Sequence, residues 1–578
     1  MRLHLTYILL FTMMVVLHFC PFGASVECNT VFYVVATLLM LSVTVNSKSS
    51  SVITFDIAFL YLFYLLYSSL ISTKTYSILN GSFMFFCWWA FFGLRRLFRQ
   101  QSIRENGLWF IVCSAYIEIA IGFLQLFGVI GNGYSEFRFG GSFGNPGMCA
   151  GYFSVIAPIV LSRILNSQED NEYSRYALLL CLILMIYFVV ISYSRGAWIA
   201  TALGIAYIIE KHYKCIKKIK SECSLIRNKY VVVCLSIILV IAMSSALYYI
   251  KKDSADGRLL IWKVALTTPH SNPLWGDGIG SFEVEYGKWQ RDYFALGKGS
   301  EHERYIADYV TCAYNEFIET YIEQGIVGVL LLLGILSMSL FRKPSCHSCH
   351  YEGAKAALIA YIVLCMVSFP SHSQVMYLLC VVVIAIIQSH YNYKQIESEG
   401  LVHKISFVSF PVIILILSVF PLLQGQKRMS EGFQKAVYGD YCGAVKKYEE
   451  AYPLLQNNGT FLQYYGSALA LSGDTLKSIK LLEQAYMKSS DPNIPLLLGD
   501  IHQKREDTSK ACISYLNAIN SIPSRLYPKY QMVNLLRKTG KDAEAHKWAN
   551  EILHTPVKVP TMAAREIRSE MYEYLKKR

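Results

Sequence analysis

Up to about residue 425, the chain alternates between long apolar runs and short polar segments. A run of about 20 apolar residues is long enough to cross a bilayer as a helix. We therefore predict about thirteen transmembrane helices. Their centres are expected near Leu10, Leu39, Leu62, Trp88, Ala120, Ile156, Leu184, Leu203, Ile238, Leu332, Leu364, Val382 and Leu415.

After residue 425 the pattern changes to amphipathic segments that repeat along the chain. Four units start at Gly439, Gly473, Glu506 and Gly540, so successive starts lie 34, 33 and 34 positions apart. A small residue, which lets two helices approach closely, follows five positions after each start: Ala444, Ser478, Ala511 and Ala545. The pattern resembles the tetratricopeptide repeat, a helix–turn–helix unit of about 34 residues. Stacked units of this kind form surfaces that usually bind protein.

Together the two patterns predict an all-α protein with two domains. Residues 1–425 are expected to form the polytopic membrane domain, with a large loop at about 251–315. Residues 426–578 are expected to form an α-solenoid of tetratricopeptide-like repeats.

The charges predict how the membrane domain is oriented. Only 16% of the residues are charged, and the formal net charge is +13. Lys and Arg gather in the loops after the fourth, eighth and tenth predicted spans, and such loops are usually cytoplasmic. With thirteen spans, the 251–315 loop and the repeats then lie on the opposite, outer side. The positive charge is thereby explained without a nucleic-acid partner.

Two polar segments stand at predicted outer boundaries in the first half of the chain. Residues 139–147 (FGGSFGNPG) are too rich in Gly and Pro to continue a helix. Their backbone NH groups suit an anion, or the segment is a plain turn in which Asn145 caps the next helix. Residues 192–197 (SYSRGA) place Arg195 at the boundary, where its guanidinium suits phosphate oxygens or snorkels to the interface.

Of two further segments, one lies within the long loop and the other begins at its end. In Gly257–Trp262, Arg258 and Trp262 are four residues apart and share a helix face, and a Gly-rich turn follows at 272–280. Arg258 is a second candidate for phosphate binding or a solvated loop residue. In 313–328, Glu316, Glu319 and Glu323 line one side of a helix that enters the membrane. Carboxylates at this depth line a water-filled cavity or are paired, unless the helix face stands above the bilayer.

These four segments, in this order, resemble motifs of the O-antigen ligase and polymerase superfamily over residues 130–390. The resemblance implies an undecaprenyl-diphosphate-linked glycan as the donor, whose diphosphate binds Arg195 and Arg258. It implies catalysis with neither a metal nor a cofactor. The loop near the donor then contains Gly144 and Asn145, and Asn315 matches the Asn of the helix motif.

One position departs from the family pattern. The family His that activates the acceptor falls on Tyr314, and a Tyr with a pKa near 10 is a poor base at neutral pH. Tyr314 is then expected to orient the acceptor hydroxyl, while Glu316 or His302 supplies the base, or the protein has lost activity.

The sequence thus predicts a glycosyltransferase of the bacterial inner membrane. The expected acceptor is a hydroxyl of lipid A core, of a protein or of a growing polysaccharide, on the periplasmic side. The repeats are expected to be periplasmic and to bind a protein partner. Two alternatives stay open: a flippase for lipid-linked glycan, and an inactive membrane scaffold that recruits partners through its repeats.

Overall fold

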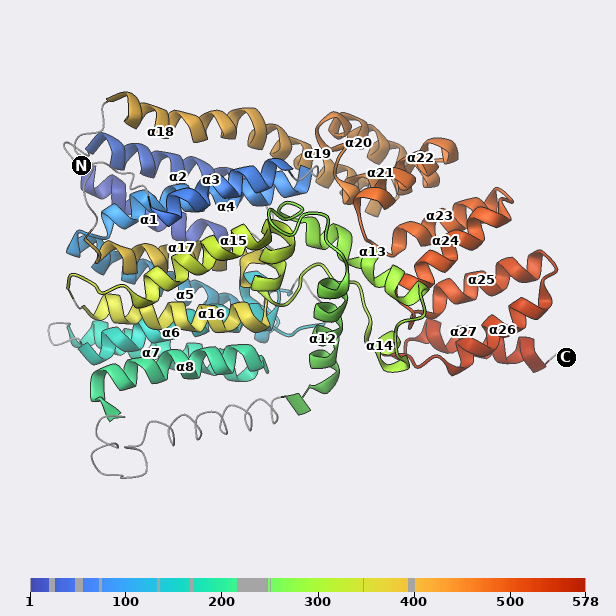
Figure 1. The fold of residues 1–578 in the computed structure, drawn as a ribbon, viewed down its shortest axis with the longest axis horizontal. Helices are drawn as coiled ribbons and strands as arrows, with labels where there is room; N and C mark the ends of the chain where they lie inside the picture. Colours follow the sequence, from blue (N-terminus) through green and yellow to red (C-terminus); the bar gives the residue numbers. More distant parts are fainter. Residues whose placement is uncertain are drawn as a thin grey trace. The chain divides into compact units, whose positions relative to one another are not determined.

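The computed structural model of this protein consists of helices and turns, with no strand in the ranges it describes. Those ranges are 2–19, 26–46, 56–71, 75–132, 136–166, 171–215, 248–249, 251–346, 348–392 and 401–576. The chain folds into two compact units (Figure 1). The first contains 1–69, 80–247 and 314–420, and the second contains 70–79, 248–313 and 421–578.

The first unit is a bundle of apolar helices. They are α1 (Arg2–Val15), α2 (Val26–Asn46), α3 (Ile57–Ile71), α4 (Thr75–Leu97), α5 (Gln101–Leu126), α6 (Pro146–Asn166), α7 (Glu172–Ile191), α8 (Arg195–Tyr213), α15 (Glu316–Phe341), α16 (Cys349–Val367), α17 (Gln374–Ser389) and α18 (Leu401–Ile414). Shorter turns of helix are η1 (Val16–Phe19), η3 (Gly141–Phe143), η4 (Pro370–His372) and η5 (Leu415–Val419).

Seven helices of the described ranges are long and apolar enough to cross a membrane. They are 26–45, 101–126, 146–166, 172–191, 316–341, 349–367 and 405–437, and three shorter apolar helices lie at 4–19, 57–71 and 374–389. A helix stands at every predicted span that the structure describes, while the ninth, near Ile238, lies outside the described residues. The protein is therefore a polytopic helical membrane protein, and the count of thirteen stays a prediction.

Helices α6, α8 and α16 pack closely against one another in the first unit. Glycines permit this approach: a Cβ at Gly204 of α8 would lie 2.5 Å from Pro158 Cγ of α6, and one at Gly353 of α16 would lie 3.3 Å from Ile159 Cα of α6. Small residues at helix contacts are the usual means of packing in a membrane. This packing fixes the ends of the three helices relative to one another.

The second unit contains the long loop and the repeats. The loop forms α12 (Lys252–Thr267), α13 (Ser281–Ala295) and α14 (Glu301–Ile306). The repeats form α19 (Phe420–Val437), α20 (Tyr441–Leu455), α21 (Gly459–Ser472), α22 (Thr475–Lys488), α23 (Asn493–Lys504), α24 (Thr508–Ser521), α25 (Leu526–Lys538), α26 (Asp542–His554) and α27 (Met562–Lys576). The predicted helical repeats are confirmed.

A shared contact explains the repeat pattern. The small residues at Ala444, Ala511 and Ala545 are fully buried. Glycines on the partner helices meet large side chains: a Cβ at Gly432 would lie 2.6 Å from Tyr448, and one at Gly499 would lie 2.5 Å from Tyr515. In these two pairs, α19–α20 and α23–α24, the helices approach closely because a Gly of one faces an aromatic ring of the other.

The loop packs on the edge of the repeats within this second unit. Gln290 of α13 is buried, and its amide donates to the Ser521 carbonyl (2.7 Å) at the end of α24 and to the Asp308 carbonyl (3.0 Å). The Ser490 hydroxyl donates to the Glu283 carbonyl (2.7 Å), and Lys558 Nζ donates to the Ala307 carbonyl (2.9 Å). Loop and repeats thus form one body.

Candidate functional site

Three of the four predicted segments meet at one end of the first unit. A Cβ at Gly147, where α6 begins, would lie 3.7 Å from Ser194 Oγ, the residue before α8. A Cβ at Gly196 of α8 would lie 3.0 Å from Val367 Cγ2 at the end of α16. The Asn315 amide in turn donates to the Met366 carbonyl (3.1 Å). Segments 139–147, 192–197 and 313–328 are therefore neighbours.

Helices α6, α8 and α15 all begin at this end. The NH groups at a helix N-terminus carry a partial positive charge and favour an anion nearby. Arg195 is the first residue of α8, where Ser194 caps the helix by accepting from Ala197 N (3.4 Å). Tyr193, directly before Ser194, has a positive φ of 51°, so the turn before Arg195 is tight.

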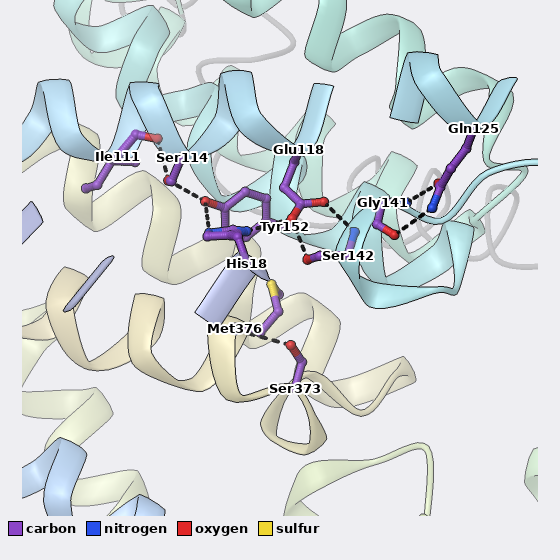
Figure 2. Close-up of polar contacts among 10 residues, drawn as sticks. All are labelled: His18, Ile111, Ser114, Glu118, Gln125, Gly141, Ser142, Tyr152, Ser373 and Met376. Carbon is purple, nitrogen blue, oxygen red and sulfur yellow. Dashed lines mark hydrogen bonds and ion pairs between the residues drawn. The ribbon is translucent and has the colours of Figure 1, made fainter. Parts of the chain in front are cut away.

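The Gly-rich loop 139–144 is held by side chains of α5 (Figure 2). The Gln125 carboxamide oxygen accepts from Gly140 N (2.9 Å) and Gly141 N (2.8 Å), while its NH2 group donates to the Gly141 carbonyl (3.0 Å). Glu118 accepts from the backbone NH of Ser142 (2.9 Å) and from its hydroxyl. The backbone NH groups that were predicted to suit an anion therefore donate to a carboxyl and an amide side chain of the protein itself.

The end of this loop starts α6. Asn145 Oδ1 accepts from Gly147 N (2.8 Å), and the Asn145 carbonyl accepts from Cys149 N (3.1 Å). Pro146 is the first residue of the helix, where its missing NH costs nothing. Gly144 has a positive φ of 68°, which a side chain would disfavour. Asn145 therefore caps the helix, which is the plainer of its two predicted roles.

Helix α15 begins with Asn315 as its cap. Asn315 Oδ1 accepts from Phe317 N (3.0 Å) and Ile318 N (3.1 Å). The predicted row of carboxylates follows, and Glu316, Glu319 and Glu323 are all buried. They are therefore not a solvated helix face, and burial at this depth requires partners.

The partners of Glu316 and Glu319 come from the turn between α16 and α17. Glu316 accepts from the backbone NH of Ser371 (2.8 Å) and from its hydroxyl. Glu319 pairs with His372 Nε2. The His372 side chain is 34% exposed, so its imidazole is accessible at the surface of the first unit. The sequence reasoning missed His372, because 53 positions separate it from Glu319 and no helical spacing relates them.

His372 carries a positive charge at neutral pH. Burial lowers the pKa of its imidazole, but the charges of Glu319, Glu316 and Glu323 and the hydrogen bond that the imidazole donates to Glu319 outweigh this and raise the pKa to about 10. An imidazole that already holds both protons cannot accept another. A raised pKa makes His372 a poor base near pH 7.

Tyr314, at the family's His position, stands just before this helix. Its backbone has a positive φ of 51°, and its ring meets the Phe369 ring edge-on at 5.1 Å between centroids. Phe369 in turn contacts the His372 ring at 6.0 Å. Tyr314 is thus packed in an aromatic row beside the carboxylates.

The remaining segment lies in the second unit. Trp262 of α12 donates its indole NH to the Ala313 carbonyl (2.8 Å), directly before Tyr314 in the chain. The predicted Gly-rich turn is present, with positive φ at Gly276, Gly278 and Gly280. Arg258 lies on α12, one helical turn before Trp262. Because Arg195 belongs to the first unit, the predicted convergence of the two arginines stays a prediction.

The second unit contains an oriented histidine, His302. His302 Nε2 of α14 pairs with Asp256 Oδ2 of α12 (2.9 Å), and 49% of the His302 side chain is exposed. Tyr248 donates to the other Asp256 oxygen (2.5 Å). The Tyr248 hydrogen bond is the main cause that lowers the pKa of Asp256, and the His302 interactions add to it. Asp256 therefore stays ionised and holds the imidazole in place.

The fold and this set of polar helix ends define a polytopic membrane protein with a helical-repeat region. Residues 180–333 match the O-antigen ligase family model. The expected resemblance is confirmed for this part of the chain, which contains the segments at 192–197, 257–280 and 313–328. The match supports glycosyl transfer at a membrane, with a glycan and an acceptor as substrates.

Other comparisons add little. No curated protein matches the chain. Solved structures of MamA share 17% identity in "MamA AMB-1 P212121", with a TM-score of 0.23 over 27% of this chain and 84% of that one. The "Crystal structure of MamA" shares 18%, with a TM-score of 0.22 over 25% of this chain and 91% of that one. These TM-scores are too low to assign a fold.

Proposed function

We propose that this protein is an inner-membrane glycosyltransferase of the O-antigen ligase type. The donor is a glycan linked to undecaprenyl diphosphate. The acceptor is a hydroxyl of lipid A core, of a protein or of a growing polysaccharide on the periplasmic side. The observation that carries the proposal is the position of Arg195, at the end of the bundle where α6, α8 and α15 all begin.

Arg195 and Arg258 are proposed to hold the diphosphate of the donor. A guanidinium binds phosphate oxygens with a planar pair of NH donors and stays charged at every physiological pH. The N-terminus of α8 adds partial positive charge beside Arg195. Negative charge grows on the diphosphate as it leaves the sugar, so fixed positive groups stabilise the transition state more than the ground state.

His302 is proposed as the base that activates the acceptor. Asp256 holds one ring nitrogen, and about half of the side chain is exposed to a substrate. The acceptor oxygen forms a bond to the anomeric carbon as its proton passes to His302. The bond from that carbon to the phosphate oxygen breaks, and undecaprenyl diphosphate leaves. Tyr314, Asn315 and Glu316 are proposed to orient the acceptor hydroxyl.

Substitution of the arginines in the natural host tests this function. Arg195→Ala and Arg258→Ala should each lower the surface glycan roughly 100-fold, with accumulation of the lipid-linked donor, measured by mass spectrometry. Arg195→Lys should restore only part of the product, because Lys lacks the planar fork. Arg505→Ala, an exposed arginine of the repeats, is the matched control. Normal glycan in stably produced Arg195→Ala protein would favour the scaffold alternative.

The choice of base has its own test. His302→Ala should abolish transfer while the lipid-linked donor still binds. His372→Gln should retain transfer if His302 is the base. The reverse result would assign the role of base to the Glu319–His372 pair instead.

A further inference from the structure

A polar cluster lies inside the first unit, behind the Gly-rich loop that Glu118 holds. His18 of η1 and Glu118 of α5 are fully buried, and His18 Nδ1 lies 2.6 Å from Glu118 Oε1. The Tyr152 hydroxyl of α6 lies 3.2 Å from His18 Nε2 and 2.6 Å from Ser114 Oγ. Figure 2 shows the four side chains pointing toward one another.

Such a cluster is costly in an apolar bundle. Ionisable residues within membrane helices are rare, and apolar residues of the same volume usually stabilise a core as well or better. Packing alone therefore does not account for Glu118. Its remaining bonds indicate its use, because both go to Ser142 of the Gly-rich loop.

Glu118 and Gln125 act on the loop from the same face of α5. They are seven residues apart, which is about two helical turns. Between them they bind the backbone NH groups of three consecutive residues, Gly140, Gly141 and Ser142. A Cβ at Gly141 would overlap Glu118 Oε2, so the loop fits against this carboxylate only with Gly there.

We propose that Glu118 and Gln125 are positioning residues of the donor site. They fix the loop, the loop fixes the start of α6, and α6 starts beside Ser194 and Arg195. His18 orients the Glu118 carboxylate from η1. The inference rests on the proposed function, in which Arg195 binds the donor.

Full-length protein in lipid nanodiscs provides the test, with undecaprenyl diphosphate as the probe and undecaprenyl monophosphate as the comparison. Glu118→Gln keeps the size of the side chain but replaces one carboxyl oxygen by an NH2 group, which cannot accept a hydrogen bond. It should raise amide hydrogen exchange of residues 139–144 and weaken diphosphate binding, each roughly tenfold, as loss of a buried hydrogen bond predicts. Gln125→Leu should act in the same direction.

Ser114→Ala is the matched control. It removes a buried hydrogen bond to Tyr152 from the same helix without touching the loop. It should lower thermal stability while the exchange of 139–144 and the binding of the probe stay unchanged. Stability loss alone therefore does not mimic the expected result.

The outcomes separate the two proposals. If wild-type protein binds the probe and Arg195→Ala does not, the proposed donor site is supported. In that case, unchanged probe binding or unchanged amide exchange of the loop in Glu118→Gln overturns the positioning role. If wild-type protein does not bind the diphosphate, the proposed function fails, and the inference fails with it. Equal loss of binding in Ser114→Ala and Glu118→Gln would also overturn it.

Discussion

At the scale of single residues, the end of the first unit where α15 begins concentrates charges that would be unstable alone. Three buried carboxyl groups on α15 lie near His372, which comes from a short turn between two other helices, and Glu319 pairs with it directly. Removal of one partner from a buried pair leaves an uncompensated charge and is strongly destabilising. The pair therefore makes the stability of this end depend on pH.

Stability should fall as the pH rises from 7 to 10. The ordinary pKa of the imidazole, 6.5, applies to the unfolded chain, and the folded value is about 10. Between these values the folded state binds one more proton, so the stabilisation is complete below pH 6.5 and is lost as the pH passes about 10. Thermal unfolding in detergent measures this, and His372→Gln should show a smaller decrease. An identical pH dependence in both proteins would contradict the prediction.

The sequence could predict only part of this site. The spacing of Glu316, Glu319 and Glu323 reveals a shared helix face, because that information is local. Their partners Ser371 and His372 lie in a turn that no periodic pattern relates to α15. The Gly-rich loop is predictable from its composition. The binding of its NH groups to α5 is not, because Glu118 stands alone within an apolar run. A lone carboxylate in such a run was the available signal.

At the scale of helices, contacts between the loop and the repeats depend on a few buried polar groups. Gln290→Ala would leave the buried end of α24 without its donor at the Ser521 carbonyl. A loss of about 1–3 kcal/mol is expected, because a buried acceptor without a partner costs that much. Amide hydrogen exchange should rise in 281–295.

Lys263→Ala is the control for this change. Its ion pair with Glu303 lies within the loop and is half exposed, so its removal should cost about 0–1 kcal/mol. Exchange in 281–295 that rises equally in both variants would show that Gln290 has no special role in docking.

The Gly–aromatic contacts of the repeats give a second prediction at this scale. Gly499→Ala should destabilise the repeats by about 1–3 kcal/mol, because the new methyl group meets the Tyr515 ring inside a packed pair. Gly540→Ala, where nothing lies within 4 Å but φ is 73°, separates crowding from backbone strain. Thermal unfolding of the full chain measures both. A larger effect at Gly540 would mean that packing is not the limiting factor.

The helices themselves were largely predictable. Apolar length and the 33- to 34-residue period are properties of short stretches of sequence, so the predicted spans and repeats fall on helices in the described ranges. The docking of α13 on the repeats was not predictable, because Gln290 and Ser521 are 231 positions apart. Neither residue stands out in composition.

At the scale of the whole molecule, the charge pattern predicts that the repeats and the 342–348 turn lie on opposite sides of the membrane. Two natural cysteines test this, because Cys442 of the repeats and Cys346 of the turn are both free and exposed. A membrane-impermeant maleimide applied to intact spheroplasts should label Cys442 but not Cys346, as measured by peptide mass spectrometry. Both should react after permeabilisation. Labelling of Cys346 in intact spheroplasts would reverse the predicted orientation.

The attachment of α13 to the edge of the repeats restricts how this protein can be re-engineered. A chimera that takes only residues 421–578 from a relative would lose the bonds that Gln290, Ser490 and Lys558 make. A chimera that exchanges 248–313 together with 421–578 would keep these contacts between the loop and the repeats. Natural variation in the repeats should accordingly be matched by compensating changes along α13.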